Sequence, residues 1–296
     1  MQKDAFYTAH PAVNLIFFLT VLLITAFVLH PVITGISFVS AFCYAVYLKG
    51  RQALRFTALF VLPVMLFVAV INPLFNHAGT TALFYFKNGN AVTLEAVLYG
   101  VVSAAMFAAL LLWFMCLNSV MTSDKYVCLF GRAIPALSML FSMALRFVPR
   151  FTQRISQVSE AQRSLSGQEG NSIVKRVSHG LSVISMTVTW ALESAVGVSD
   201  SMRSRGYGLK GRTSFSIFRF DKRDVLLAVM ITVFGAAAIA AMALKNISFR
   251  FYPSIKYSCS GVLGAVGCAA FLLLTLLPVL LNVEESIKWR ALRSGI

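Results

Sequence analysis

Arginine and lysine side chains are the groups in this sequence whose number and spacing most plainly suggest a chemical task. The chain of 296 residues has 26 of them against 11 acidic residues, and 15 of the 26 lie between residues 118 and 224. An arginine guanidinium can form paired hydrogen bonds with a carboxylate, or bond the free carbonyl groups at the end of a helix. The basic stretch therefore predicts a surface that holds another protein.

Residues 206–211 read Gly-Tyr-Gly-Leu-Lys-Gly, which matches the G-x-G-x-x-G pattern of nucleotide-binding loops. With Arg212 and Thr213 the sequence also comes near a phosphate-binding loop. Both motifs require a strand before and a helix after, and the phosphate-binding loop requires lysine where Arg212 stands. A long helical pattern precedes Gly206 instead. The stretch therefore favours a glycine-rich exit from a helix over a nucleotide site.

Other reactive side chains are scattered along the chain. The four histidines, His10, His30, His77 and His179, show no metal-ligand spacing on one helix, so we expect neither a metal ion nor a cofactor. No catalytic set of nucleophile, base or paired carboxylates stands out. The apolar segments carry almost no charge, which argues against an ion- or proton-coupled carrier.

Two alternatives to a protein-binding scaffold stay open from the residues alone. A self-contained secondary carrier or channel predicts inverted repeats and polar residues at mid-membrane. A membrane-embedded enzyme predicts acids or histidines clustered at one membrane face. Neither pattern is evident in the sequence.

The composition indicates which elements must position the basic stretch. Hydrophobic residues make up 58% of the chain and charged residues 12%, whereas soluble domains carry about a quarter charged residues. We therefore predict an all-α, polytopic membrane protein, whose net charge of +15 reflects its topology rather than nucleic-acid binding. Six apolar runs approach the roughly 20 residues that span a bilayer: residues 13–29, 32–48, 56–71, 92–117, 225–244 and 259–281.

These runs divide the chain into three regions. Residues 1–117 hold four spans, residues 118–224 form the basic region, and residues 225–296 hold two spans and a basic tail. We expect the third span to end at Asn72 and Pro73, because proline cannot continue the helical hydrogen bonds. If the N-terminus lies inside the cell, 22 lysines and arginines are cytoplasmic and four are outside. This split predicts a plasma-membrane protein with both termini and the basic region in the cytoplasm.

The basic region contains two long helical patterns, at about residues 135–165 and 172–205, after a shorter one at about residues 123–134. Three arginines share one face of the first long pattern: Arg146, Arg150 and Arg154. An apolar stripe runs along the second: Val177, Leu181, Ile184, Val188, Leu192 and Ala195. Neither helix is apolar enough for a simple lipid-exposed span. We expect both to lie partly in the membrane interface and to pack on each other.

Four short stretches carry recognisable motifs: His10–Leu15, Asn72–Gly79, Leu145–Pro149 and Ser201–Gly208. They resemble the transmembrane T components of energy-coupling factor (ECF) transporters, the EcfT/CbiQ family. The second matches the N-P-x-F-x-H-x-G loop of that family, the third its L-R-F-x-P motif and the fourth its second Ala-Arg-Gly-type coupling motif. The first resembles the start of the family's first span, although the family's Asp, Arg and Lys are replaced. The resemblance covers roughly residues 5–245.

The sequence departs from the family pattern in two places. The first coupling motif of the family reads approximately A-Q-x-A-R-G, and Leu165 stands here where its arginine is expected. Either Arg163 takes that role, or this helix end holds its partner mainly through apolar contact. The apolar run 259–281 is an additional span, because the family commonly ends after one span beyond the coupling region.

The resemblance implies a non-enzymatic scaffold with two cytoplasmic coupling helices that cross in an X. Each helix end would dock on one of two ABC ATPase subunits, which hydrolyse the ATP. A small membrane-embedded S component would bind the vitamin or metal ion. The residues implied in ATPase coupling are Arg205, Ser204, Gly206, Arg163 and Ser164. The residues implied as structural positions of family motifs are Asn72, Pro73, Phe75, His77, Gly79, Arg146 and Pro149.

Overall fold

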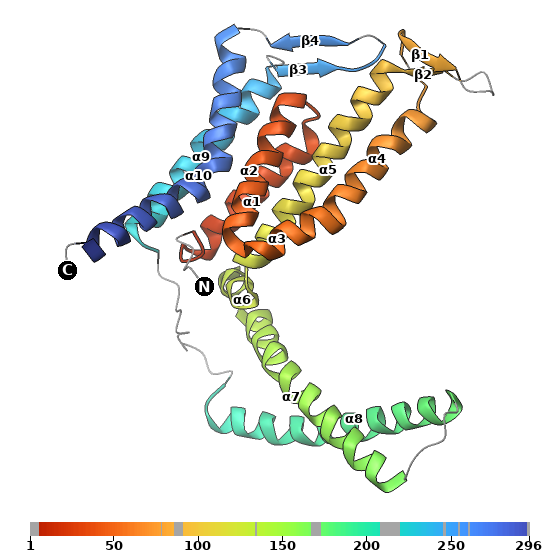
Figure 1. Cartoon of the computed structure of the whole chain (residues 1–296). Coiled ribbons are helices and arrows are strands. Elements are labelled where there is room, and N and C mark those ends of the chain that lie inside the picture. Colours follow the sequence, from red (N-terminus) through yellow and green to blue (C-terminus); the bar gives the residue numbers. More distant parts are fainter. Residues whose placement is uncertain are drawn as a thin grey trace. The chain divides into compact units, whose positions relative to one another are not determined.

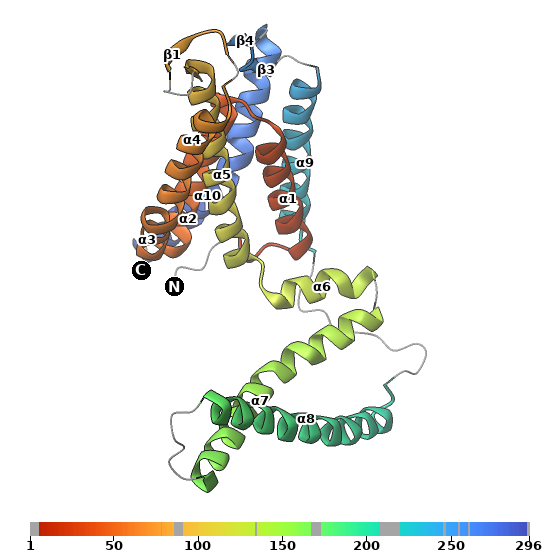
Figure 2. The same ribbon diagram turned by 90° about the vertical axis from the view of Figure 1, so that its right-hand side faces the viewer.

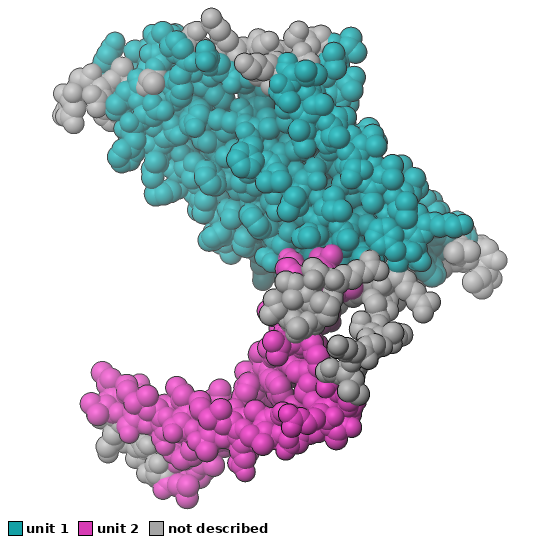
Figure 3. Space-filling model, turned by 180° about the vertical axis from the view of Figure 1, so that it is seen from behind, with its two compact units in different colours: residues 1–122, 218–296 teal, residues 123–217 magenta. Residues whose placement is uncertain are grey.

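The computed structural model describes residues 6–77, 79–85, 91–133, 135–166, 173–207, 220–244, 247–253, 255–259 and 261–294. The chain forms two compact units, drawn in different colours in Figure 3. The first combines residues 1–122 with residues 218–296, and the second comprises residues 123–217. Helices dominate both units, which confirms the predicted all-α fold class.

The first unit is a bundle of helices capped at one end by two short β-hairpins (Figure 1). Its helical elements are α1 (Pro11–Phe27), α2 (Pro31–Lys49), α3 (Arg51–Phe56), η1 (Thr57–Val61), α4 (Leu62–Phe75), α5 (Leu94–Val120), α9 (Lys222–Ala243) and α10 (Gly261–Ser294). Its antiparallel strands are β1 (Ala82–Tyr85) with β2 (Ala91–Thr93), and β3 (Ile247–Arg250) with β4 (Lys256–Cys259). The second unit consists of α6 (Ser123–Ala133), α7 (Pro135–Ser166) and α8 (Ile173–Ser204).

Six helical segments of the described chain are long and apolar enough to cross a membrane. They are α2, residues 51–75, α5, residues 176–204 of α8, α9 and residues 262–289 of α10. Five coincide with predicted spans. The predicted span 13–29 corresponds to α1, which is apolar but only 17 residues long. The prediction that α8 is not apolar enough was wrong, because its residues 177–192 carry no acidic or strongly basic side chain.

The third span runs past the residues that were expected to end it. Pro73 lies inside α4, which continues to Phe75. Because Pro73 is in the last turn, it removes only the hydrogen bond to the Ala69 carbonyl. That carbonyl faces α5, where a Cβ atom added to Gly100 would lie 2.9 Å from the Ala69 oxygen. The absence of a side chain at Gly100 therefore lets α5 approach α4 closely.

Aromatic side chains form the core between α1, α2 and α5. The buried rings in contact are Phe17, Phe18, Tyr44 and Trp113. The indole Nε1 of Trp113 donates a hydrogen bond of 3.0 Å to Ser37 Oγ, which lies 2.8 Å from Thr25 Oγ1. This chain of bonds satisfies polar groups that would otherwise be costly to bury. It joins the three helices at one level of the bundle.

The additional helix α10 is an integral part of this bundle. It packs on both α2 and α9, and Phe271 and Leu274 are fully buried there. Removing α10 would therefore expose apolar surface on two other helices.

In the second unit, α7 and α8 cross each other (Figure 2). The predicted helices at 135–165 and 172–205 are confirmed to within one residue. The predicted apolar stripe of α8 does not face α7, since Val177, Leu181 and Leu192 are exposed. The buried positions of α8 are instead Val183 and Thr187. The periodicity marked a real helix face, but this face is left uncovered in the isolated chain.

Candidate functional site

The C-terminal end of α8 is a well-defined structure that presents Arg205. The N–H of Tyr207 bonds the carbonyl of Met202 at 3.1 Å, and the N–H of Gly206 bonds the carbonyl of Arg203 at 3.0 Å. This pair of bonds is a Schellman motif, in which the residue after the cap adopts a left-handed conformation. Gly206 does so, with φ of 75°, and only glycine tolerates this without strain.

The same end holds two exposed polar side chains. Ser204 Oγ donates a hydrogen bond of 2.9 Å to the carbonyl of Ser201, and the Arg205 side chain is exposed. The prediction of a helix exit at Gly206 is confirmed, whereas residues 208–213 lie outside the described part of the chain. Arg205 is therefore presented by a rigid turn.

The C-terminal end of α7 differs in chemistry. Ser164 Oγ donates a hydrogen bond of 3.0 Å to the carbonyl of Glu160, and both Arg163 and Leu165 are exposed. Leu165 is 87% exposed, an unusual degree for leucine. At 3.6 residues per turn, positions 163 and 165 project about 200° apart. Arg163 therefore points away from the side that Leu165 occupies.

The two helix ends lie at opposite ends of the crossed pair. Near the start of α7, Leu140 lines the same groove as Tyr207, which follows the end of α8. Near the end of α7, Gln162 Nε2 donates a hydrogen bond of 2.7 Å to Ser182 Oγ in the first half of α8. The helices are thus antiparallel, so the end carrying Arg163 is far from the end carrying Arg205. Each helix has 32 residues and spans about 48 Å.

The arginine stripe on α7 is divided between solvent and α8. Arg146 and Arg150 are exposed. The Arg154 guanidinium carbon lies 5.2 Å from the centre of the Trp190 ring of α8, within the range of a cation–π contact. The spacing of the three arginines predicted their shared face but gave no sign of the contact with Trp190. Pro149 is exposed within α7, and Thr152 Oγ1 donates a hydrogen bond of 2.9 Å to the Pro149 carbonyl.

The Asn72–Gly79 motif lies in the first unit, where Glu95 fixes the chain that follows it. The buried Glu95 carboxylate accepts hydrogen bonds from Thr81 Oγ1 at 2.6 Å and Thr80 Oγ1 at 3.2 Å, and from both backbone N–H groups. Gly79 has φ of 143°, and a Cβ atom there would lie 2.5 Å from Glu95 Oε2. Glycine is therefore required at 79. The sequence showed Glu95 only as an acid at the start of a span.

The other motif residues bind this loop to neighbouring elements. Asn72 lies against Gly100 of α5. Asn76 Nδ2 donates a hydrogen bond of 2.9 Å to the hydroxyl of Tyr252, which lies in the hairpin after α9. Burial raises the pKa of the Tyr252 phenol. Phe75 is 82% exposed and His77 is half-buried. The motif thus has a structural part in the bundle and one projecting aromatic ring.

The start of α1 is linked to the start of α9, a feature that the sequence did not reveal. His10 Nδ1 accepts a hydrogen bond of 3.2 Å from the N–H of Ala12, so this histidine caps α1. The His10 N–H donates a hydrogen bond of 3.1 Å to Asp224 Oδ1. Asp224 Oδ2 accepts a hydrogen bond of 3.1 Å from the N–H of Asp221. A histidine can therefore cap this helix where the family pattern has aspartate.

Within the described residues, no three His, Cys, Asp or Glu side chains gather as metal ligands would. The residues singled out for coupling are exposed helix ends, which suit contact with a macromolecule.

Comparison with known proteins agrees with the motifs. The family described as CbiQ, cobalt transport protein, matches residues 3–215. The chain belongs to this family. The chain is also similar to curated proteins named energy-coupling factor transporter transmembrane protein EcfT. It is 30% identical over 114 residues to the one from Lactobacillus helveticus. The identity is 29% over 100 residues in Lactococcus lactis subsp. cremoris and 28% over 107 residues in Bacillus selenitireducens.

These alignments cover only part of each protein. They include 38%, 33% and 35% of this chain, and 41%, 37% and 40% of the respective relatives. The chain is thus a multi-pass membrane protein of the EcfT/CbiQ family.

Proposed function

We propose that this chain is the transmembrane scaffold and transducer of an ECF-type ABC importer. The coupling region, residues 118–224, would lie in the cytoplasm between the membrane regions 1–117 and 225–296. The chain would hydrolyse no ATP itself. Two ABC ATPase subunits would do so, and a small S component in the plasma membrane would bind the vitamin or metal ion.

The observation that carries this proposal is the pair of exposed helix ends on the second unit. Arg205 and Leu165 stand at opposite ends of a crossed, antiparallel helix pair whose members each span about 48 Å. Two separated contacts suit a dimer of ATPase subunits, each of which would hold one end. A movement of the two subunits toward each other would then change the crossing of α7 and α8.

Arginine suits the contact at the end of α8. Its guanidinium can pair with a carboxylate in a groove of the ATPase through two parallel hydrogen bonds. The Schellman turn fixes the backbone at Gly206 immediately beyond it. Less conformational freedom is therefore lost on binding than for a frayed helix end.

Charge reversal tests this role directly. We expect Arg205→Glu to weaken ATPase recovery in a detergent pull-down roughly tenfold or more, because it replaces attraction by repulsion in the contact. Uptake should fall in parallel, while the amount of the chain in the membrane stays unchanged. Arg150→Glu is the matched control, since Arg150 is an exposed arginine of α7 away from both helix ends. Full complex recovery and uptake with Arg205→Glu would rule out the docking role.

The composition of the complex tests the wider proposal. The tagged chain from its native membrane should co-purify with two ATPase chains and one small hydrophobic protein. A chain that purifies alone, and transports a solute when reconstituted alone, would instead be a self-contained secondary carrier.

A further inference from the structure

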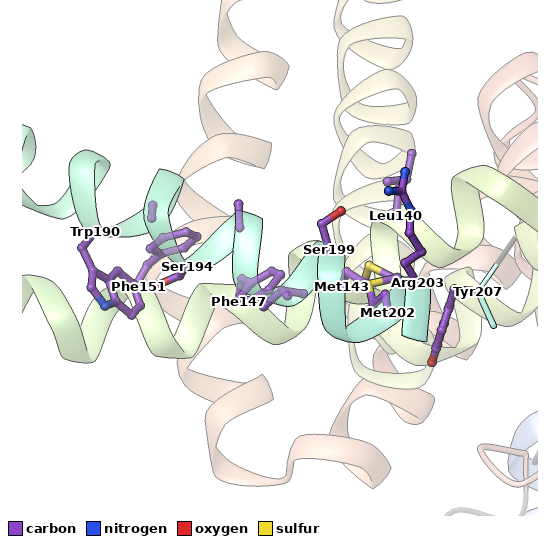
Figure 4. A pocket seen from close by; sticks show the side chains of 13 residues that line it. Leu140, Met143, Phe147, Phe151, Trp190, Ser194, Ser199, Met202, Arg203 and Tyr207 are labelled. Atoms are coloured by element: carbon purple, nitrogen blue, oxygen red, sulfur yellow. The ribbon is translucent and has the colours of Figure 1, made fainter. Parts of the chain in front are cut away.

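A groove between α7 and α8 has no role in the scaffold function described above. It has a volume of about 520 Å³ and is lined mainly by apolar side chains. Figure 4 shows Phe151 and Trp190 toward one end of the groove, and Arg203 and Tyr207 at the other. Its size lies within the usual range of small-molecule sites, roughly 300–1,000 Å³.

We propose that the α7–α8 groove binds one acyl chain of an anionic phospholipid, with the lipid phosphate at Arg203. The lining supports an apolar, flexible ligand. Phe147, Phe151 and Met202 are each half-buried, so their apolar surfaces are partly open to the groove. Covering this surface with a hydrocarbon chain is favourable, because it removes apolar area from water.

The dimensions of the groove fit a single chain. Along α8 it runs from Trp190 to Arg203, which is 13 residues or about 20 Å along the axis. One leaflet of a bilayer core is about 15 Å thick, so an acyl chain fits within this length. The groove is therefore long enough to hold one acyl chain.

The charge at one end selects the headgroup. Arg203 carries the only charged side chain among the described residues that line the groove. Its side chain is exposed, so it can reach a phosphate outside the apolar part. Tyr207 lines the same end of the groove. An anionic lipid is therefore favoured over a zwitterionic one of the same chain length.

Trp190 provides a built-in reporter for this ligand. The full-length chain in detergent is titrated with phosphatidylglycerol whose acyl chains carry bromine, and the quenching of tryptophan fluorescence is measured. Trp190→Phe defines the quenching due to Trp113 and Trp289, and the difference belongs to Trp190. We expect saturable quenching of Trp190, with about fivefold lower affinity for brominated phosphatidylcholine, since one arginine near a lipid surface contributes about 1 kcal/mol.

Two variants separate the acyl site from the headgroup contact. Ser194→Phe places a ring in the groove and should abolish the quenching of Trp190. Arg203→Gln should leave quenching in place but make the affinities for the two lipids equal. Arg176→Gln, an exposed arginine near the other end of α8, is the control and should keep the fivefold preference.

Three results would overturn the proposal. The first is that neither lipid quenches Trp190, and the second is that quenching persists unchanged in Ser194→Phe. In the third, lipid would be displaced when the ATPase and S subunits assemble with the chain, which would make an apolar protein segment the occupant. The quenching titrations use the chain alone and need no transport activity, so their outcome is independent of the proposed function.

Discussion

Asp224 at the start of α9 accepts a hydrogen bond from the backbone N–H of His10 at the start of α1, at 3.1 Å and across 214 positions of sequence. The same carboxylate accepts the N–H of Asp221, and it is buried. One side chain thus fixes where two helices of the bundle begin. The α9 end of this link is also the point where the chain re-enters the first unit after residues 123–217.

We expect Asp224→Ala to destabilise the first unit by about 2–3 kcal/mol. The variant removes a capping interaction, worth about 1 kcal/mol, and leaves the buried His10 N–H without its acceptor. The melting temperature of the detergent-solubilised chain should fall by several degrees. Asp200→Ala, at an exposed position of α8, should leave it unchanged. Equal melting of both variants would show that the His10–Asp224 bond contributes nothing to stability.

Gly79→Ala tests the loop that Glu95 organises. The backbone at 79 has φ of 143°, and the added methyl group would meet Glu95 Oε2 and Thr93 Oγ1. Since both strain and a steric clash result, we expect a loss of at least 2 kcal/mol in stability. Gly35→Ala in α2 is the control, because no atom lies within 4 Å of the added carbon. The idea fails if both variants are as stable as the parent chain.

The helices were predictable because their causes are local. Uninterrupted apolar runs gave the bundle helices, and Gly206 marked the end of α8. Glu95, Asp224 and Trp190 could not be identified, because their partners come from other elements and no spacing in the sequence announces them. The prediction that Pro73 ends the third span was wrong for a related reason. A proline in the last turn removes only one hydrogen bond, and the sequence does not show that Gly100 of α5 lies close to this turn.

Gly206→Ala tests whether the turn itself holds Arg205 in place. Alanine at φ of 75° costs roughly 1–2 kcal/mol, so the Schellman bonds should open and the last turn of α8 should fray. Hydrogen exchange at the amides of Gly206 and Tyr207 should become several times faster. In Gly197→Ala, the matched change inside α8, helix propensity predicts equal or slower exchange. Unchanged protection in Gly206→Ala would mean that another contact holds the turn.

At the end of α7, charge reversal can distinguish whether Arg163 or Leu165 contacts the ATPase. Leu165 occupies the position of the family's arginine and is 87% exposed, while Arg163 projects about 200° away. We therefore expect Leu165→Glu to reduce ATPase recovery tenfold or more, since burying a leucine contributes about 1.5–3 kcal/mol. Leu165→Arg should keep recovery, because it restores the family's side chain at the same place. Arg163→Glu should change recovery no more than Gln153→Glu, an exposed control on the same helix. If Arg163→Glu abolished recovery and Leu165→Glu did not, the arginine one half-turn earlier would be the contact, and the partner would approach α7 from its other side.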